Sequence, residues 1–454
     1  MAVIGWQSVL ALLIAAIAVG FGYFRPFHQD QRHAVPIGEE PYPDEEQQKQ
    51  ESLDNLVKDN TDADVVIEVE TDDNDDNNSH NPKEEDVIFV IGDLHGDAKC
   101  ARQWIEAIQV VDDVETPKEW LQPKASVVFM GDYIDKGPWS YQTMKLVRTL
   151  TDAFPDRVTA LMGNHEMELL KDRDPRRLSK YIHYPYSSVH PGEYLNFLDR
   201  DVDDKDELVL DLLLNASLEV YAGGYYRSVV YTPEVKRKGT YAVTALMPES
   251  VQPLVRDRLE EYQHAYLKAF MSNTTLGKWV EARPVAHVQN GFFFVHGGIS
   301  KAAADALPTL QSVDDLNKKV LTNAQDTNFL WFIEQTREGR IASDLMLHRG
   351  NHKGENACFE LAAMLDSMEG VERLVVGHTP GKNVRIKCDD SFFAVDSLLG
   401  RYIRTSGNHY CPDEGRASRT GKFVCPPLTE HCEGQIIVIT GDDKIELLQM
   451  NPID

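Results

Sequence analysis

The sequence predicts an α/β fold in which buried strands alternate with helices, and three observations lead to this prediction. Residues 86–97 are an apolar run that breaks into Gly-Asp-Leu-His-Gly-Asp, as expected of a buried strand that ends in a tight turn. The same succession of apolar strand and glycine beside Asp, Asn or His returns in four later segments. Amphipathic helical patterns lie between the first of these strands. Because ligands of open α/β sheets bind at the carboxyl ends of the strands, these strand ends are the candidate functional site.

A hydrophobic segment precedes the predicted strands. Ala2 to Phe24 is apolar apart from Gln7 and Ser8, which is long enough to span a bilayer with some tilt. We therefore expect a transmembrane or signal-anchor segment at residues 1–24. A cleaved signal peptide, with Ala18-Val19-Gly20 as its cleavage site, is the competing interpretation.

Residues 25–86 are expected to form a disordered acidic linker. From residue 37 to residue 86 there are 19 Asp and Glu and three Lys, with Pro, Gln and Asn among them, so this stretch has little to bury in a core. It carries more than half of the net charge of −27. The net negative charge of the chain argues against nucleic acid as a partner, because the phosphates of a nucleic acid would repel it.

The sequence leaves open which side of the membrane carries the remaining chain. Arg25 and Arg32 follow the hydrophobic segment directly, which favours a cytoplasmic location by the positive-inside rule. Three Asn-x-Ser/Thr sequons, at Asn77, Asn215 and Asn273, favour a lumenal or extracellular domain. We expect either a membrane protein with a single N-terminal anchor or a protein of the secretory pathway.

The six cysteines divide into two groups along the sequence. Cys100 and Cys358 each lie beside an apolar helical pattern and are expected to be small core residues. For the four in the last quarter of the chain, the alternatives are disulfides in an oxidising compartment, a zinc site or free thiols. These four are Cys388, Cys411, Cys425 and Cys432.

Strands and helices alternate after the first strand. The predicted elements are a helix at 98–110, a strand at 125–130, a helix at 141–150 and a strand at 157–162. The second strand runs into Gly131-Asp132-Tyr133-Ile134-Asp135-Lys136-Gly137, and the third runs into Gly163-Asn164-His165-Glu166. Three successive strands therefore deliver Asp or Asn directly after a glycine.

About 130 residues separate His165 from the next such strand, which is too long for a simple connection. Residues from about 170 to 290 are therefore predicted to be an insertion that forms a helical cap, and Val255 to Phe270 has helical spacing within it. Later strands are predicted at 291–296, 371–377 and 391–396, with a hairpin at 435–448. Residues 87–454 are expected to form one domain.

Five strand ends place a carboxylate, amide or imidazole beside a glycine. The set consists of Asp93, His95, Asp132, Asn164, His296 and His378. Such mixed oxygen and nitrogen donors suit Zn, Fe or Mn, and we expect two divalent or trivalent ions of this kind as cofactors. Two ions that share a bridging carboxylate are an arrangement used for in-line attack on phosphate.

The motifs Gly-Asp-x-His-Gly, Gly-Asp-x-x-Asp-x-Gly, Gly-Asn-His-Glu, His-Gly-Gly and Gly-His-Thr occur in this order. They resemble those of the calcineurin-like metallophosphoesterases and, among these, of the phosphoprotein phosphatase superfamily. The resemblance extends from about Asp86 to Leu448. The long insertion and the run from Gly277 to Ala286 look most like the Shewanella-like protein phosphatase branch. The resemblance implies a β-sandwich that is flanked by helices.

The resemblance also implies a role for each residue. The six donors would hold two metal ions, with Asp132 bridging them. His165 would be the general acid, oriented by Asp135. The phosphate-binding residues would be Lys136, Arg349 and Asn164. Most of the family has arginine where this chain has Lys136, which keeps the positive charge but loses the bidentate fork.

These roles define the expected function. It is a metal-dependent phosphomonoester hydrolase, foremost a protein phosphatase for phosphoserine, phosphothreonine or phosphotyrosine, which acts by direct attack of a hydroxide that bridges the two metals. A dinucleoside polyphosphatase or another hydrolase of small phosphoesters is the alternative, and a catalytically inactive, membrane-tethered binding module is the alternative of another class. The expected partners are a phosphoprotein substrate and, through the N-terminal segment, a membrane.

Overall fold

The structure, a computed structural model, describes residues 86–174, 189–222, 248–325, 328–354, 356–402, 416–417, 424–425, 431–441 and 444–450. The expected anchor at 1–24 lies outside the described residues, and so does the expected linker apart from Asp86. Within the described ranges, no helix combines the length and the apolar character that crossing a membrane requires.

Five strands form the first sheet, in the order β12-β11-β1-β2-β3. β1 and β3 each pair in parallel with β2, whereas β11 runs antiparallel to both β1 and β12. The strands are β1 (Val87–Ile91), β2 (Ala125–Phe129), β3 (Val158–Ala160), β11 (Gln435–Thr440) and β12 (Lys444–Gln449). The first three predicted strands and the predicted hairpin are thus confirmed.

The second sheet also has five strands, in the order β4-β5-β6-β8-β7. β5, β6 and β8 are parallel neighbours, and β4 and β7 are antiparallel edges. The strands are β4 (Ala286–Gln289), β5 (Phe292–Val295), β6 (Arg373–Val376), β7 (Arg385–Lys387) and β8 (Phe392–Ala394). The three predicted strands of this region are present, and both edge strands were missed by the prediction.

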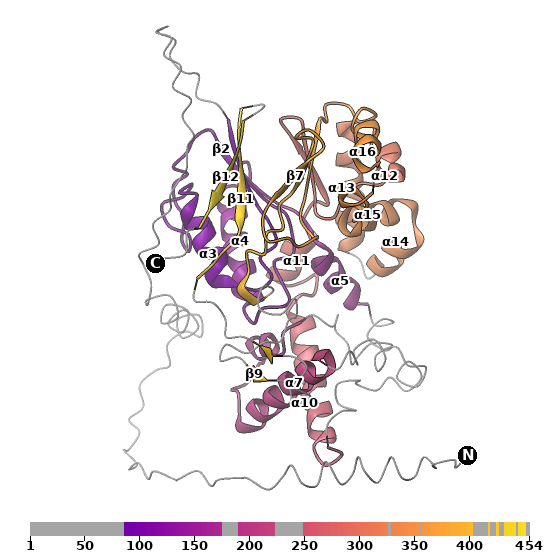
Figure 1. The fold of residues 1–454 in the computed structure, drawn as a ribbon. Helices are drawn as coiled ribbons and strands as arrows, with labels where there is room; N and C mark the ends of the chain where they lie inside the picture. Colours follow the sequence, from indigo (N-terminus) through magenta and orange to yellow (C-terminus); the bar gives the residue numbers. More distant parts are fainter. Residues whose placement is uncertain are drawn as a thin grey trace, which may run out of the picture. The chain divides into compact units, whose positions relative to one another are not determined.

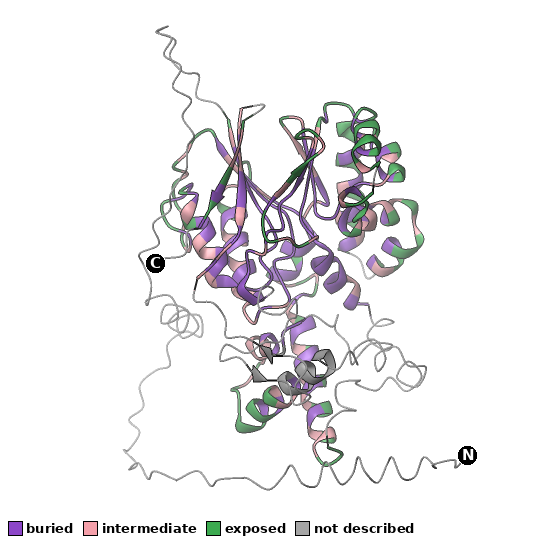
Figure 2. Cartoon of the chain, in the orientation of Figure 1, coloured by how far each residue is buried: buried purple, intermediate pink, exposed green. Residues whose placement is uncertain are grey.

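The two sheets face each other across a shared apolar core. β1 contributes Ile88 and Val90 to this core, and β5 contributes Phe292 and Phe294; all four are fully buried. Because alternate side chains of a strand point to opposite faces, Phe89 of β1 belongs instead to the core beneath the helices. Figure 2 shows the central strands of both sheets buried, as the expected sandwich requires, whereas the edge strands β7 and β12 are largely exposed or half-buried.

Helices cover the outer faces of the two sheets (Figure 1). On the first sheet, Trp104 and Val147 are fully buried in the core that also includes Phe89. The helices of the sandwich are α3 (Ala98–Ala107), α4 (Ser140–Ala153), α5 (Asn164–Asp172), α12 (Lys301–Ala306), α13 (Leu310–Ala324), α14 (Phe329–Gln335), α15 (Arg337–Leu347), η3 (Gly350–His352) and α16 (Ala357–Leu365). A short strand pair, β9 (Arg416–Ala417) and β10 (Val424–Cys425), lies apart from both sheets.

The described parts of the predicted insertion are helical. They are η1 (Pro191–Phe197), α7 (Asp204–Ala222), α10 (Gln252–Ala269) and α11 (Thr275–Glu281). Tyr266 of α10 contacts Tyr194 and Phe197 of η1, with ring centroids 5.5 and 5.2 Å apart. Arg200 binds both Asp206 of α7, with Nη1 and Oδ2 2.6 Å apart, and Glu261 of α10, with Nε and Oε1 2.7 Å apart. Aromatic packing and ion pairing therefore join these helices.

The described cysteines pair across the two groups that the sequence suggested. Cys100 is bonded to Cys432, and Cys358 to Cys388. The prediction that Cys100 and Cys358 are simple core residues was therefore wrong. The spacing of apolar residues along a helix does not reveal which distant residue a cysteine on that helix contacts. β11 returns to pair with β1 and so brings Cys432, just before β11, beside α3. The side chains outside the described part are those of Cys411 and Cys425.

Candidate active site

The loop after β1 carries the first two predicted metal donors. The Asp93 carboxylate accepts the backbone N–H of His378 through Oδ2, at 3.1 Å. His95 donates from Nδ1 to the carbonyl oxygen of Ile134 at 3.2 Å, so Nε2 is the ring nitrogen that carries the lone pair. This Nε2 lies 3.7 Å from Asp93 Oδ2 and 3.7 Å from Asp132 Oδ2.

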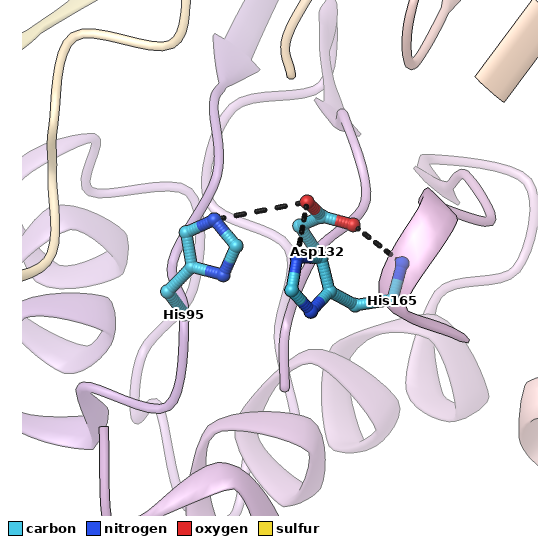
Figure 3. A group of neighbouring side chains, drawn as sticks. All are labelled: His95, Asp132 and His165. Atoms are coloured by element: carbon cyan, nitrogen blue, oxygen red, sulfur yellow. Dashed lines mark hydrogen bonds and ion pairs between the residues drawn. The ribbon is translucent and has the colours of Figure 1, made fainter. Parts of the chain in front are cut away.

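Asp132, which follows β2, is the residue on which the site converges. Its Oδ2 lies 3.7 Å from Nε2 of both His95 and His165, and 3.2 Å from Nε2 of His296. Its Oδ1 accepts the backbone N–H of His165 at 3.0 Å, as Figure 3 shows. The close approach requires Gly163, because a Cβ at that position would collide with Asp132 Oδ1. Asp132 therefore has the central place that a bridging ligand needs.

The remaining donors come from three further strand ends. Asn164 opens α5, His296 follows β5, and His378 follows β6. His296 donates from Nδ1 to the carbonyl oxygen of Met130 at 2.7 Å, and its Nε2 lies 3.0 Å from Asn164 Oδ1. Asp132, His296 and His378 each offer a donor atom within 4.8 Å of the others. The structure thus brings all six predicted metal donors together.

The charges of this cluster suit bound cations. Burial raises the pKa of Asp93 well above its usual range, and the Asp396 carboxylate raises it further. Burial lowers the pKa of His296, but Asp132 and Asp93 outweigh this effect and raise it to about 9. The carboxylates therefore favour positive charge at this point. Carboxylate, amide and imidazole donors in fixed orientations are also the set that Zn, Fe and Mn accept, so these residues fit the expected ions.

The backbone at the site is strained. Left-handed φ values occur at His95 (47°), Asp132 (55°), Asp135 (70°), Lys136 (69°) and His378 (62°). Each costs on the order of 1 kcal/mol for a residue with a Cβ, and such conformations persist only where the surrounding structure imposes them. Their concentration around one cluster is typical of a functional site.

His165 and Asp135 form a buried pair beside the cluster. His165 donates from Nδ1 to Asp135 Oδ2 at 2.5 Å, and its Nε2 faces Asp132. The carboxylate behind the ring fixes the ring's orientation. The backbone N–H of Asp135 in turn donates to Ser140 Oγ at 3.0 Å. The geometry therefore allows His165 to pass a proton from Nε2 to an atom that is held at the cluster.

The two predicted phosphate-binding cations lie on different sides of the site. Lys136 turns inward, and its Nζ donates to His95 Nε2 at 2.7 Å. Burial lowers the pKa of Lys136, while the Asp132 carboxylate opposes this shift. Arg349 is exposed and donates from Nη1 to the carbonyl oxygen of His378 and to Thr379 Oγ1, both at 2.8 Å. Both positive charges are therefore adjacent to predicted metal donors.

Two buried acidic residues at the site were not predicted to have a role. The Glu166 carboxylate accepts the backbone N–H groups of Asp132 and Tyr133, each at 2.9 Å, and so holds the strained turn after β2. Asp396 follows β8, and its Oδ2 has no hydrogen-bond partner among the described residues. The signal for Asp396 was the end of an apolar strand, but no glycine adjoins it and it did not match the pattern of the others.

Comparisons with known proteins agree with this site. Residues 87–258 match the family model for calcineurin-like phosphoesterases. A PP2A-like serine/threonine-protein phosphatase of Candida albicans is 33% identical over 79 residues, which are 17% of this chain and 16% of that protein. A symmetrical bis(5'-nucleosyl)-tetraphosphatase of a Janthinobacterium species is 30% identical over 123 residues, 27% of this chain and 36% of that protein. The chain thus spans 16% of the length of the first of these curated relatives and 36% of the length of the second.

A solved structure, the cold-active protein-tyrosine phosphatase of a psychrophilic Shewanella species, has 17% sequence identity and a TM-score of 0.43, with 80% of each chain covered. The match to the family model includes Asp93, Asp132 and His165, whose side chains meet at one site. Residues 87–258 of this chain are therefore similar to the calcineurin-like phosphoesterases, and the candidate active site includes donors from this matched segment.

Proposed function

We propose that this protein is a metal-dependent phosphomonoester hydrolase, and foremost a protein phosphatase. The observation that supports this is the convergence of three imidazole Nε2 atoms, from His95, His165 and His296, on Asp132 Oδ2, with Asp135 behind His165. A bridging carboxylate with a proton donor beside it is what phosphoester hydrolysis at a two-metal site requires. An inactive binding module would have no use for the His165–Asp135 pair.

The residues of the site would have three different roles in this reaction: they would hold the ions, bind the phosphate group and donate a proton. The ions would be held by Asp93, His95, Asp132, Asn164, His296 and His378. Bound there, such ions supply a water that ionises near neutral pH and positive charge for phosphoryl oxygens. Arg349 and Lys136 add positive charge for the phosphate group. His165 donates a proton from Nε2 to the departing oxygen, and Asp135 holds the ring so that Nε2 faces the cluster.

The exposed basic side chains near the cluster bear on the substrate. Arg349, Lys353, Arg385 and Lys387 lie around His352; burial first, and then these charges, lower its pKa to about 4. Of the four, Arg349, Lys353 and Lys387 are exposed. Such a rim suits a phosphopeptide with acidic residues beside the phosphate. A polyphosphate chain would use the same charges, so hydrolysis of a dinucleoside polyphosphate remains the second candidate function.

A direct comparison of substrates tests this proposal. The purified full chain would be stripped with a chelator, reloaded with Mn²⁺, Fe²⁺ or Zn²⁺, and assayed on phosphopeptides, 4-nitrophenyl phosphate and diadenosine tetraphosphate. We expect metal-dependent hydrolysis with the highest kcat/KM for a phosphopeptide, and a loss of about 10²- to 10⁴-fold in kcat for His165→Asn. Preference for diadenosine tetraphosphate would favour the second candidate, and phosphopeptide binding without turnover would favour the binding module.

We also propose that the domain lies on the lumenal or extracellular side of a membrane, tethered by its N-terminal segment. The two disulfides support this side, because disulfides persist in oxidising compartments. Asn273, which belongs to a sequon, is exposed between α10 and α11. Protease protection of sealed membrane vesicles and a glycosidase-sensitive mass at Asn273 are expected. Accessible, reduced and unglycosylated protein would place the domain in the cytoplasm instead.

A further inference from the structure

The insertion contacts the loop that follows the second motif, and η1 makes this contact. Glu193 of η1 is only 1% exposed. Its Oε2 accepts the backbone N–H of Ser140 at 2.7 Å, and its Oε1 accepts that of Tyr141 at 3.0 Å. Asn196 of the same turn donates from Nδ2 to the carbonyl oxygen of Pro138 at 3.2 Å. Three hydrogen bonds thus fix residues 138–141 from within the insertion.

The Glu193 carboxylate supplies what the start of α4 lacks. The first N–H groups of a helix have no partner inside the helix and need an acceptor from elsewhere. Trp139, the residue that precedes α4, provides no side-chain hydrogen bond to them. Glu193 accepts two of these N–H groups, although it lies 53 residues beyond Ser140 in the sequence. The position of the first turn of α4 therefore depends on the insertion.

From Ser140, hydrogen bonds continue to the proposed general acid. Ser140 donates its N–H to Glu193 and accepts the N–H of Asp135 with its Oγ, at 3.0 Å. Asp135 Oδ2 then accepts the Nδ1–H of His165 at 2.5 Å. Asp135 has a φ of 70°, which only its surroundings can impose. All four residues are at most 5% exposed, so water cannot readily replace these bonds.

We infer that Glu193 is a positioning residue for the His165–Asp135 pair and acts on it through Ser140. By fixing the start of α4, the carboxylate fixes Ser140 Oγ, and Ser140 Oγ fixes the backbone of Asp135. Small displacements of a proton donor are costly in catalysis, because the proton must be transferred within hydrogen-bond distance. The inference rests on the proposed function, and it gives the insertion a part in proton transfer.

Leaving-group dependence tests this role. Loss of proton donation harms esters of weakly acidic phenols more than esters of acidic ones, because only the former need a proton as they leave. In the metal-loaded full chain, Glu193→Gln, which keeps the shape but only one acceptor oxygen, should lower kcat for phenyl phosphate about 10- to 100-fold. For 4-nitrophenyl phosphate the loss should be less than about threefold, with KM nearly unchanged for both. Ser140→Ala, which removes only the Oγ link, should give the same signature and provides the test if Glu193→Gln does not fold.

Two controls separate the possible outcomes. Tyr262→Phe removes a buried hydrogen bond of 2.6 Å to Asp206 within the insertion, outside the path to His165, and should leave the ratio of the two rates unchanged. His165→Asn measures the full leaving-group effect. If His165→Asn shows this effect but Glu193→Gln lowers both rates equally or not at all, the role of Glu193 is refuted and the proposed function stands. If His165→Asn lacks the effect, the proposed general acid itself is refuted, and the inference with it.

Discussion

Removal of the Cys100–Cys432 disulfide should destabilise this protein more than removal of Cys358–Cys388, and the loop lengths give the difference. The bonded residues are 332 and 30 positions apart. In the chain-entropy model, a crosslink contributes 1.5RT times the logarithm of the loop length plus a constant, or about 6 kcal/mol for the long loop and about 4 kcal/mol for the short one. The difference of about 2 kcal/mol is the firmer quantity, because the constant cancels.

The measurement compares two double variants, Cys100→Ala with Cys432→Ala and Cys358→Ala with Cys388→Ala. Urea unfolding of the metal-free proteins, followed by tryptophan fluorescence, gives the two losses in the free energy of unfolding. Cys100 and Cys432 are 0% and 3% exposed, so their truncation also removes apolar packing and can only enlarge the difference. An equal loss in both variants, or a larger loss in the short-loop variant, would show that unfolded-state entropy does not set the contribution of these bonds.

Three further predictions follow from the site and the insertion. Asp93→Asn should lower hydrolysis more than about 100-fold and reduce the metal bound per chain, measured by mass spectrometry, with unchanged circular dichroism; retained activity would contradict the two-metal interpretation. Lys136→Met should raise KM for 4-nitrophenyl phosphate about tenfold with little change in Tm, and an unchanged KM would exclude Lys136 from phosphate binding. Burial lowers the pKa of His190 to about 3, so between pH 6.5 and 3 the unfolded chain binds a proton that the folded chain does not. The free energy of unfolding of the metal-free protein should therefore fall by about 2 kcal/mol between pH 7 and pH 5 because of this residue. His190→Asn should reduce this dependence of the free energy of unfolding on pH, measured by urea titrations.

The central strands of both sheets could be predicted because a strand that is buried on both faces consists of an unbroken run of apolar residues. β1 and β5 are of this kind, with burial along almost their whole length. The edge strands β4 and β7 are only partly buried and their composition is mixed, so the sequence pattern did not reveal them. Their strand character comes from pairing with β5 and β8 rather than from their own residues.

The candidate site was predictable to the extent that each donor lies beside a glycine at a strand end. Asp132 follows β2 of the first sheet and His296 follows β5 of the second, and the packing of the two sheets against each other brings these strand ends together. Long-range partners were not predictable in this way. The bonds of Cys100 to Cys432 and of Glu193 to Ser140 depend on where the chain returns after long excursions, and no local spacing encodes that.

The left-handed residues around the cluster have a consequence for how this protein can change. At Asp132 and Asp135, glycine would adopt the observed φ without strain, and substitution by glycine would relieve the backbone. It would also delete the carboxylates that the site uses. Glycine at either position would therefore relieve on the order of 1 kcal/mol of strain but would leave a buried N–H of His165 without its acceptor. At these two positions the strained backbone and the buried carboxylate come together, and neither can be changed without the other.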